Sequence, residues 1–370
     1  MSILGVIFSN IHNKEMFEVS KYRTIASTPI GGRYRLIDFS LSNMVNAGIT
    51  QIGVVTKNNY QSLMGHVGSG KEWDLARKNG GLVILPPFGF TDEVYNTRLE
   101  AIKSITSFIN HSKAEYVVLT DCYHVCNIDY KDVLAFHKEK GADITCVYRE
   151  CSDESQCYFP VNAFSLAEDG RVEKMDLLDQ LNGTLKLSVD TWVLKRELLQ
   201  ALVIEAMNTN YNSFNRDILS KNLKNLKIYG YHFKGYFGNI CNLKSYYSVS
   251  KDLLKKEVRD ELFNQPGRAI YTKVRDSAPT IYGDEAKISN SLIADGCVIE
   301  GEVVNSIIFR GTKVKKGCRV ENSILMQDTV VGENIVLNKV ITDKNVQIKH
   351  KNELSGSDEF PIYVKKNGVL

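Results

Sequence analysis

A short repeat in the last third of the chain restricts the fold more than any other feature of the sequence. Four similar segments begin at Asn290, Asn305, Asn322 and Asn338, so their starts lie 15, 17 and 16 residues apart. Within these segments apolar residues recur about every six positions. This spacing predicts a parallel β-helix of hexapeptide repeats, in which three short strands form each coil and inward residues of neighbouring coils pack together. An all-β sandwich with regular turns is the alternative.

The first two thirds of the chain alternate short apolar runs with amphipathic stretches. The runs with the character of buried strands are Leu4–Phe8, Gln51–Thr56, Tyr116–Thr120, Ile144–Arg149, Leu187–Val193 and Lys227–Tyr231. Helical spacing marks Phe39–Gly48 and Arg98–Asn110, and a charged connecting helix is expected at about 244–262. This alternation predicts an α/β layer with a largely parallel sheet. We expect an α/β domain over residues 1–240, a helical linker over 241–275 and a β-helix over 276–370.

Composition excludes several classes of protein. A hydrophobic content of 43% is too high for a disordered chain. The 46 basic and 43 acidic residues are interleaved, so no nucleic-acid partner is expected. No apolar run approaches the ~18 residues that span a bilayer, and no membrane partner is expected. Eight cysteines without a Cys-x-x-Cys pair or an export signal predict reduced, mostly buried thiols and a cytoplasmic location.

The segment from Pro29 to Ile49 resembles the glucose-1-phosphate adenylyltransferases, also called ADP-glucose pyrophosphorylases. It reads Pro-Ile-Gly-Gly-Arg-Tyr-Arg-Leu-Ile-Asp-Phe-Ser-Leu-Ser-Asn-Met-Val-Asn-Ala-Gly-Ile. Within it, Gly31 and Gly32 permit a tight turn, and Arg35 with Asp38 could form an ion pair. The likeness extends over nearly the whole chain. It implies a Rossmann-like nucleotidyltransferase domain with a mixed, mostly parallel sheet, and a left-handed form of the β-helix.

The groups that such an enzyme needs for adenylyl transfer are replaced in this chain. The resemblance implies a glycine-rich phosphate loop after the first strand, but no glycine follows Ser9 there. It also implies a lysine where Ile25 stands, metal-binding aspartates where Tyr123 and Asn239 stand, and a glycine where Asp190 stands. Because the reaction depends on Mg²⁺ and on donors that neutralise phosphate charge, these replacements together predict a catalytically silent chain.

The resemblance therefore indicates a regulatory, non-catalytic subunit of this enzyme family. It would assemble with a catalytic paralogue, as a heterotetramer, and modulate synthesis of ADP-glucose from ATP and glucose 1-phosphate for glycogen. The catalytic partner would bind Mg²⁺, whereas no cofactor is expected on this chain. Since the family binds phosphate-bearing sugar effectors near the domain junction, Lys21, Arg23 and Arg33 are candidate effector-binding residues.

Two other functions remain open from the sequence. An active nucleotidyltransferase with a remodelled site would use Asp121 and Asp217 as residual metal ligands. A hexapeptide-repeat acyltransferase would need a catalytic histidine between coils, and the repeat region offers only His350.

Overall fold

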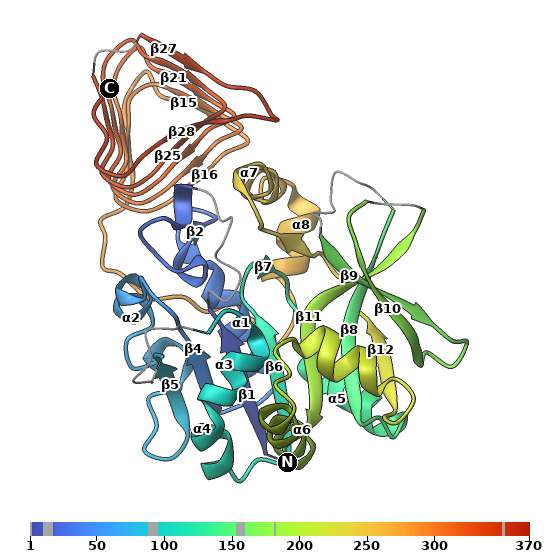
Figure 1. Cartoon of the computed structure of the whole chain (residues 1–370). Helices are drawn as coiled ribbons and strands as arrows, with labels where there is room; N and C mark the ends of the chain where they lie inside the picture. The colour runs from blue at the N-terminus through green and yellow to red at the C-terminus, as the bar shows by residue number, and fades with distance from the viewer. Residues whose placement is uncertain (1, 10–17, 88–94, 153–159, 181–182, 350–351) are drawn as a thin grey trace.

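The computed structural model describes residues 2–9, 18–87, 95–152, 160–180, 183–349 and 352–370, and shows an α/β domain joined by two helices to a β-helix (Figure 1). The sheet of the α/β domain has the order β10-β9-β11-β6-β1-β4-β5, with β8 paired to β11 and β12 to β8. Its strands are β1 (Ile3–Phe8), β4 (Gln51–Val55), β5 (Gly81–Leu85), β6 (Tyr116–Asp121), β8 (Ile144–Cys151), β9 (Val161–Leu166), β10 (Val172–Leu178), β11 (Leu185–Lys195) and β12 (Ile228–His232).

The sheet is mixed, as the family resemblance implies. Strands β6, β1, β4 and β5 are parallel, whereas β11 is antiparallel to β6, β8 and β9. The helices around it are α1 (Leu36–Asn46), α2 (Gln61–Val67), α3 (Arg98–Ser104), α4 (Thr106–His111), α5 (Tyr130–Glu139) and α6 (Arg196–Asn208). Both faces of the sheet are therefore covered, and the predicted strands all lie within observed ones to within a residue at their ends.

Strand β1 lies in the middle of the sheet and shows how both faces are filled. Leu4, Val6 and Phe8 pack into the core on one face, and Ile7 packs into the core on the other. Gly5 makes room for α1, because a Cβ at this position would lie 2.5 Å from the sulfur of Met44 and this side chain would have to move. The close approach of α1 to β1 holds the carboxyl end of the sheet next to the N-terminus of that helix.

Two expectations about helices are wrong in detail. The predicted helix over Arg98–Asn110 is interrupted between α3 and α4, where the Ser104 and Thr106 hydroxyls donate to carbonyl oxygens three residues earlier, each at 2.7 Å. Such bonds compete with continued helix hydrogen bonding. The connecting segment is also two helices, α7 (Leu243–Asp252) and α8 (Lys256–Phe263).

The expected ion pair between Arg35 and Asp38 does not form. Instead the Arg35 backbone N–H donates to the Asp38 carboxylate at 2.9 Å and caps α1, while the Arg35 guanidinium donates to Ser62. The Asp38 carboxylate also accepts hydrogen bonds from His66 and from Thr272 of the linker. Asp38 therefore links the N-terminus of α1 to helix α2 and to the linker. Its carboxylate forms no ion pair with the Arg35 guanidinium.

The C-terminal part is the predicted left-handed parallel β-helix, and the sandwich alternative is excluded. Its strands form three parallel sheets in the orders β14-β17-β20-β23-β26, β15-β18-β21-β24-β27 and β16-β19-β22-β25-β28, from β14 (Ile281–Tyr282) to β28 (Ile362–Val364). Asn290, Asn305 and Asn322 stand at one corner of successive coils with φ of 40°, 48° and 48°. Asparagine tolerates this left-handed backbone, which explains why the repeat begins with it.

One sheet of the β-helix packs on the α/β domain. Ile307, Ile324 and Ile341 point out of the solenoid into the same core as Tyr246 of α7. Beside this contact, the Arg23 guanidinium donates to both carboxylate oxygens of Asp343 at 2.7 and 2.9 Å, and both side chains are buried. An apolar contact and a buried ion pair thus fix the two parts together. The exact division of the chain at residues 240 and 275 stays a prediction.

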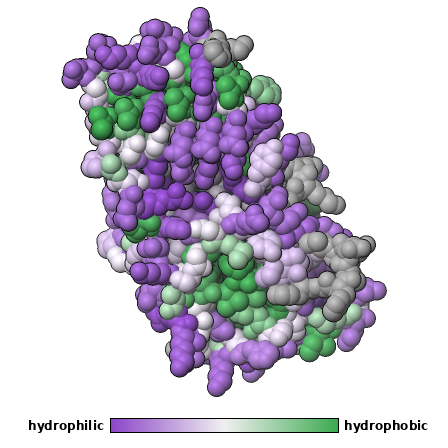
Figure 2. Space-filling model, turned by 90° about the vertical axis from the view of Figure 1, so that its left-hand side faces the viewer, coloured by the Kyte–Doolittle hydropathy of each residue, from purple (hydrophilic) through white to green (hydrophobic). Residues whose placement is uncertain are grey.

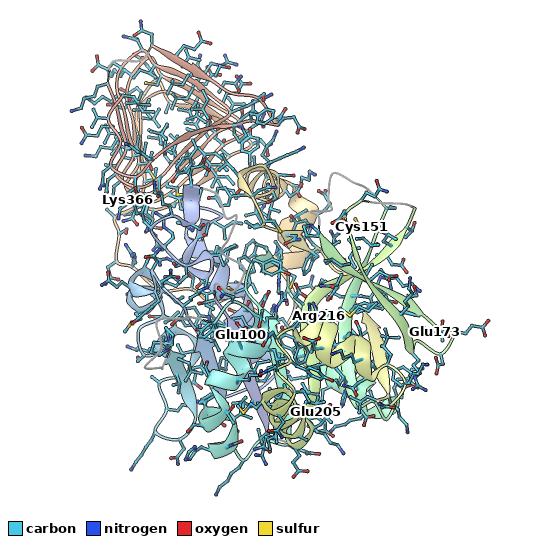
Figure 3. All side chains as sticks on the ribbon, viewed as in Figure 1. Glu100, Cys151, Glu173, Glu205, Arg216 and Lys366 are labelled. Carbon is cyan, nitrogen blue, oxygen red and sulfur yellow. The ribbon has the colours of Figure 1, made fainter. Side chains whose placement is uncertain are left out.

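Most cysteines match the expected state. Six are free, namely Cys122, Cys126, Cys146, Cys241, Cys297 and Cys318. Cys151, labelled in Figure 3, is disulfide-bonded, which corrects the expectation of reduced thiols for that residue. Disulfide formation depends on the relative geometry of two Cα–Cβ bonds, which spacing in a sequence does not reveal. Cys157 lies outside the described residues. Among the helices of the described chain, none combines the length and apolar character needed to cross a bilayer.

The register of the β-helix leads to a stability prediction. The Val314 side chain is fully buried inside the solenoid, whereas Lys315 is exposed. Val314→Asp would place a carboxylate in an apolar interior and should lower the free energy of unfolding by about 3 kcal/mol or more. Lys315→Asp is the matched control and should change it by less than about 0.5 kcal/mol. Thermal denaturation of both variants checks this, and equal melting temperatures would show that the register is wrong.

Candidate functional site

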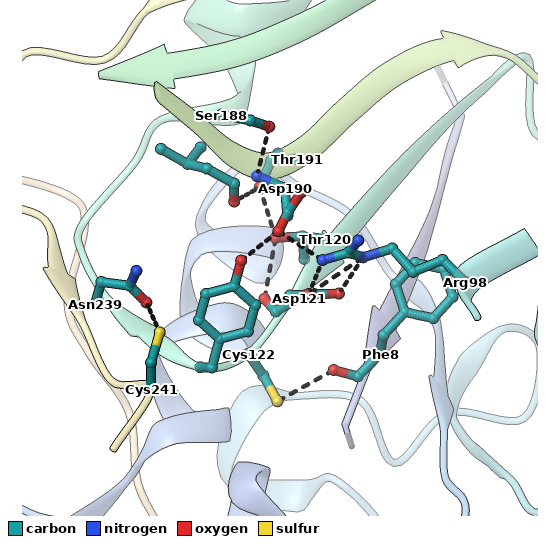
Figure 4. A network of polar contacts seen from close by, with 12 residues as sticks. Phe8, Arg98, Thr120, Asp121, Cys122, Ser188, Asp190, Thr191, Asn239 and Cys241 are labelled. Carbon is teal, nitrogen blue, oxygen red and sulfur yellow. Dashed lines mark hydrogen bonds and ion pairs between the residues drawn. The ribbon is translucent and has the colours of Figure 1, made fainter. Parts of the chain in front are cut away.

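A buried network of charges lies at the carboxyl end of the sheet, where parallel α/β proteins place their ligand sites (Figure 4). Arg98, the first residue of α3, donates from Nε to Asp121 Oδ1 at 3.1 Å and from Nη2 to Asp190 Oδ2 at 2.6 Å. Its Nη2 also donates to Asp121 Oδ2. Asp121 ends β6, Asp190 lies on β11, and the Tyr123 hydroxyl donates to Asp190. One guanidinium therefore lies between two carboxylates.

The backbone at Asp190 explains how this carboxylate reaches the site. Asp190 has a φ of +50°, in the left-handed region that favours glycine, and it lies at an irregularity in the pairing of β11 with β8. The resemblance implies a glycine at this position. The aspartate keeps the glycine-type backbone and adds a carboxylate directed toward Arg98 and Tyr123. A non-glycine residue at positive φ is a source of local strain, which the two polar contacts offset.

The electrostatics of the network follow from burial. Burial lowers the pKa of the Arg98 guanidinium, but Asp121 and Asp190 together raise it above its ordinary value. Burial raises the pKa of the Asp121 carboxyl to about 6, although Arg98 acts against this rise. Burial and the two neighbouring carboxylates also raise the pKa of Tyr123 well above its ordinary value. Arg98 and Tyr123 therefore remain protonated at neutral pH and serve as hydrogen-bond donors.

The other residues at the positions of the missing chemistry have structural partners. Asn239 lies on β13 (Gly238–Asn239), pairs with β7 (His124–Val125) and accepts a hydrogen bond from the Cys241 thiol at 3.2 Å. Ile25 is buried in the short helix Ile25–Ser27 and belongs to the apolar core. An amide and an alkyl side chain therefore stand where the resemblance implies a carboxylate and an ammonium group.

The proposed residual metal ligands are engaged by cations. Asp217 lies beside Arg216, which is labelled in Figure 3 and donates to both of its carboxylate oxygens at 3.0 Å. Lys221 lies 3.4 Å from the same carboxylate, and these contacts lower the pKa of Asp217. Asp121 is bound by Arg98. Within the described residues no group of three or more His, Cys, Asp or Glu side chains could hold a metal ion. His350 lies outside the described residues.

A second polar site lies where the α/β domain, the linker and the β-helix meet. The pocket is lined by Pro29, Gly32, Arg33, Tyr34, Arg35, His66, Lys273, Arg275, Phe309, Arg310, Gln327 and Lys344. Six of these side chains are arginine or lysine, and none is acidic. On the face of the molecule in Figure 2, the surface between the two parts is mainly hydrophilic. Such a cluster of cations suits an anion with several acceptor oxygens. A planar guanidinium group can donate two parallel hydrogen bonds to the oxygens of a phosphate or carboxylate.

The three candidate effector residues have different places in this region. Arg33 lines the pocket. Arg23 is held in the buried ion pair with Asp343, so its guanidinium has a structural partner. Lys21 is exposed, with its Nζ 5.7 Å from the ring centre of Tyr22, and it does not line the pocket. None of these placements tests effector binding, which stays a prediction.

Sequence reasoning missed most of the pocket. Arg35, Lys273, Arg275, Arg310 and Lys344 come from β3 (Tyr34–Arg35), the linker and two coils of the solenoid. No motif joins them, because the contact between distant segments brings them together. The available signal was the register of the repeat, since Arg310 and Gln327 stand at equivalent corners of successive coils.

Comparisons with known proteins agree with this architecture. Residues 14–256 match the family described as nucleotidyl transferase, and residues 278–360 match the GlmU-like C-terminal hexapeptide family. The chain is similar to the glycogen biosynthesis protein GlgD of Bacillus subtilis, with 34% identity over 99% of this chain and 96% of that protein. It is also similar to the glucose-1-phosphate adenylyltransferases of Bacillus mycoides and Bacillus cereus, each 31% identical over 87% of this chain and 86% of the relative.

The Arg98 network gives a prediction about stability and pH. Arg98→Met removes the guanidinium that pairs with Asp121 and Asp190 and should cost about 3–5 kcal/mol near pH 8, where a buried carboxylate without this partner is charged. Because the pKa of Asp121 is already raised to about 6, acid neutralises this group and the cost should be smaller near pH 5.

Chemical denaturation at the two pH values measures this difference. Arg98→Lys is the matched control, because lysine keeps the charge but cannot contact both carboxylates with a planar group. It should lose less stability than Arg98→Met near pH 8. A cost for Arg98→Met that is the same at both pH values would contradict the assignment.

Proposed function

Since this chain belongs to the nucleotidyl transferase family that includes the glucose-1-phosphate adenylyltransferases, we propose that it is a regulatory, non-catalytic subunit of such an enzyme in glycogen biosynthesis. It assembles in the cytoplasm with a catalytic paralogue, as a heterotetramer, and modulates the formation of ADP-glucose and pyrophosphate from ATP and glucose 1-phosphate. The similarity to a glycogen biosynthesis protein over 99% of this chain supports the pathway.

The observation that carries this proposal is the guanidinium of Arg98 between Asp121 and Asp190. In an adenylyltransferase, carboxylates at this edge of the sheet hold Mg²⁺, which neutralises the phosphates. Here both carboxylates already pair with a cation of the same chain, and Tyr123 and Asn239 stand where the metal-binding aspartates are expected. A bound Mg²⁺ would have to displace Arg98 from a buried site. The arrangement therefore supports a chain that does not bind the metal of the reaction.

The second part of the proposal is that the cationic pocket binds a sugar phosphate or a similar anion as effector. Arg33 and Arg35 lie on the α/β side of the pocket, Lys273 and Arg275 on the linker, and Arg310 with Lys344 on the β-helix. An anion contacted from all three sides would hold the two parts of the chain together more firmly. Effector binding can thereby alter the contacts between this subunit and its catalytic partner.

The activity of the isolated chain tests the non-catalytic assignment. Loss of metal carboxylates removes several kcal/mol of transition-state stabilisation, and each ~1.4 kcal/mol is a tenfold change in rate. The purified chain with Mg²⁺, ATP and glucose 1-phosphate should therefore release pyrophosphate at least about a thousandfold more slowly than a catalytic relative. A rate within about tenfold of that relative would favour the remodelled enzyme instead.

Assembly with a catalytic paralogue tests the regulatory role. Mixing the two purified chains should give an oligomer that contains both, as measured by native mass spectrometry. The mixed oligomer should differ from the catalytic subunit alone in substrate or effector affinity by about 5–150-fold, which corresponds to a coupling free energy of ~1–3 kcal/mol.

The Arg275→Glu chain is the control for that experiment, because it changes the pocket but no described contact of the core. It should still assemble with the catalytic subunit while weakening the response to a phosphate-bearing effector. If the two wild-type chains remain separate and the kinetics of the catalytic subunit are unaltered at every ratio, the regulatory proposal fails.

A further inference from the structure

Lys344 differs from the other cations of the pocket in its surroundings. It follows β25 (Val340–Thr342) and Asp343 and lines the pocket from the β-helix side. Arg35 of β3, Arg23 of the N-terminal segment and Arg275 of the linker lie close enough to act on its charge, and so does the acidic Asp343 beside it. Arg33, His66, Lys273 and Arg310 line the same pocket. Lys344 therefore stands in a half-buried position among several positive charges.

The carboxylates near Lys344 are already engaged by other groups. Asp343 accepts two hydrogen bonds from Arg23 and one from the Tyr363 hydroxyl at 2.8 Å. Asp38 accepts hydrogen bonds from the side chains of His66 and Thr272. Little negative charge is left to compensate the ammonium of Lys344. The pocket thus carries an excess of positive charge that only a bound anion or the loss of a proton can relieve.

Arginine and lysine side chains respond differently to an excess of positive charge. Guanidinium groups stay charged in proteins. Lys273 lines the pocket and donates to the Gly65 carbonyl at 2.6 Å. Burial, followed by the neighbouring arginines, lowers the pKa of Lys344 to about 7. In the empty pocket Lys344 is therefore partly neutral near physiological pH.

We propose that the pocket takes up a proton on Lys344 when it binds an anion, so that its affinity for phosphate-like anions rises as the pH falls. The inference rests on the proposed effector role of this pocket. An anion placed among the cations favours the charged form of the lysine, because opposite charges stabilise each other. By thermodynamic linkage, an anion that raises the proton affinity of Lys344 binds more tightly at lower pH. The regulatory subunit thereby responds to effector and to pH at one site.

The direction of the effect follows from the two states of Lys344. Below about pH 7 the lysine is charged in the free and in the bound protein, so anion affinity is high and changes little with pH. Above this value the free protein must first take up a proton, and affinity falls by up to about tenfold per pH unit. His66 does not contribute to this pH dependence. Burial lowers the pKa of its imidazole below the ordinary value, so the ring stays neutral over this pH range.

Sulfate is the probe of choice, because it carries the same charge at about pH 6.5 and about pH 8.5 whereas inorganic phosphate titrates between them. Isothermal titration calorimetry of the full chain should give a dissociation constant about tenfold lower near pH 6.5. Near pH 8, titrations in two buffers with different ionisation enthalpies should show uptake of most of one proton per sulfate.

Two variants assign the proton to Lys344. Lys344→Arg cannot lose its charge and should bind sulfate with the same affinity at both pH values. Lys344→Gln lacks the charge and should bind weakly at both. Circular dichroism establishes that each variant is folded. A pH dependence that persists in the folded Lys344→Arg chain would overturn the assignment.

The outcomes separate this inference from the proposed function. Sulfate binding to the wild-type chain that is equal at both pH values would overturn the proton uptake and leave the effector pocket intact. If sulfate and glucose 1-phosphate both fail to bind at either pH, the proposed effector pocket is contradicted, and the inference with it.

Discussion

One buried guanidinium pairs with two carboxylates at the carboxyl end of the sheet in the α/β domain. Arg98 contacts Asp121 and Asp190, and Tyr123 adds a hydrogen bond to Asp190. Burying charges costs free energy unless they are paired and hydrogen-bonded, so each member of this group needs the others. The same contacts fill the edge of the sheet at which a nucleotidyltransferase carries out its chemistry. The loss of metal binding that we propose would therefore have the same cause as the stability of the site.

The junction between the two parts of the chain supports the regulatory side of the account. The Arg23–Asp343 ion pair and the apolar contact of Ile307 and Ile324 with α7 hold the β-helix against the α/β domain. Next to the ion pair, Lys344 and the surrounding arginines form the pocket in which we propose that an effector binds. An anion there adds contacts across the same junction. Because binding at this position favours one arrangement of the two parts, it can alter contacts with a partner subunit.

Much of the fold could be predicted because it depends on local patterns. The β-helix follows from a repeat that begins with asparagine, and Asn290 and Asn305 occupy the left-handed corners for which that residue is suited. The sheet follows from alternating apolar runs. The interruption between α3 and α4 was not predicted, because it depends on hydroxyl groups that bond to the backbone rather than on apolar spacing.

The sites were predictable only in part, because they depend on contacts between distant segments. The resemblance implies that Tyr123, Asn239 and Asp190 stand at positions of missing chemistry, but it does not pair Asp190 with Arg98, which lies 92 residues earlier. Likewise Arg23 was a candidate for effector binding, and only the fold brings it to Asp343. Lys344 and Arg275 had no motif to mark them. Pairing across the fold, rather than residue type, decides which cations remain available to a ligand.

The central claim is that Arg98 replaces the metal ion of the family, and divalent-metal binding tests it most directly. Electron paramagnetic resonance of Mn²⁺ added to the purified chain with ATP and glucose 1-phosphate reports the fraction of metal that is bound. The account predicts that Asp121→Asn leaves this fraction unchanged, because Asp121 binds Arg98 and no metal. Mn²⁺ bound at one site per chain, and lost in a folded Asp121→Asn variant, would contradict it.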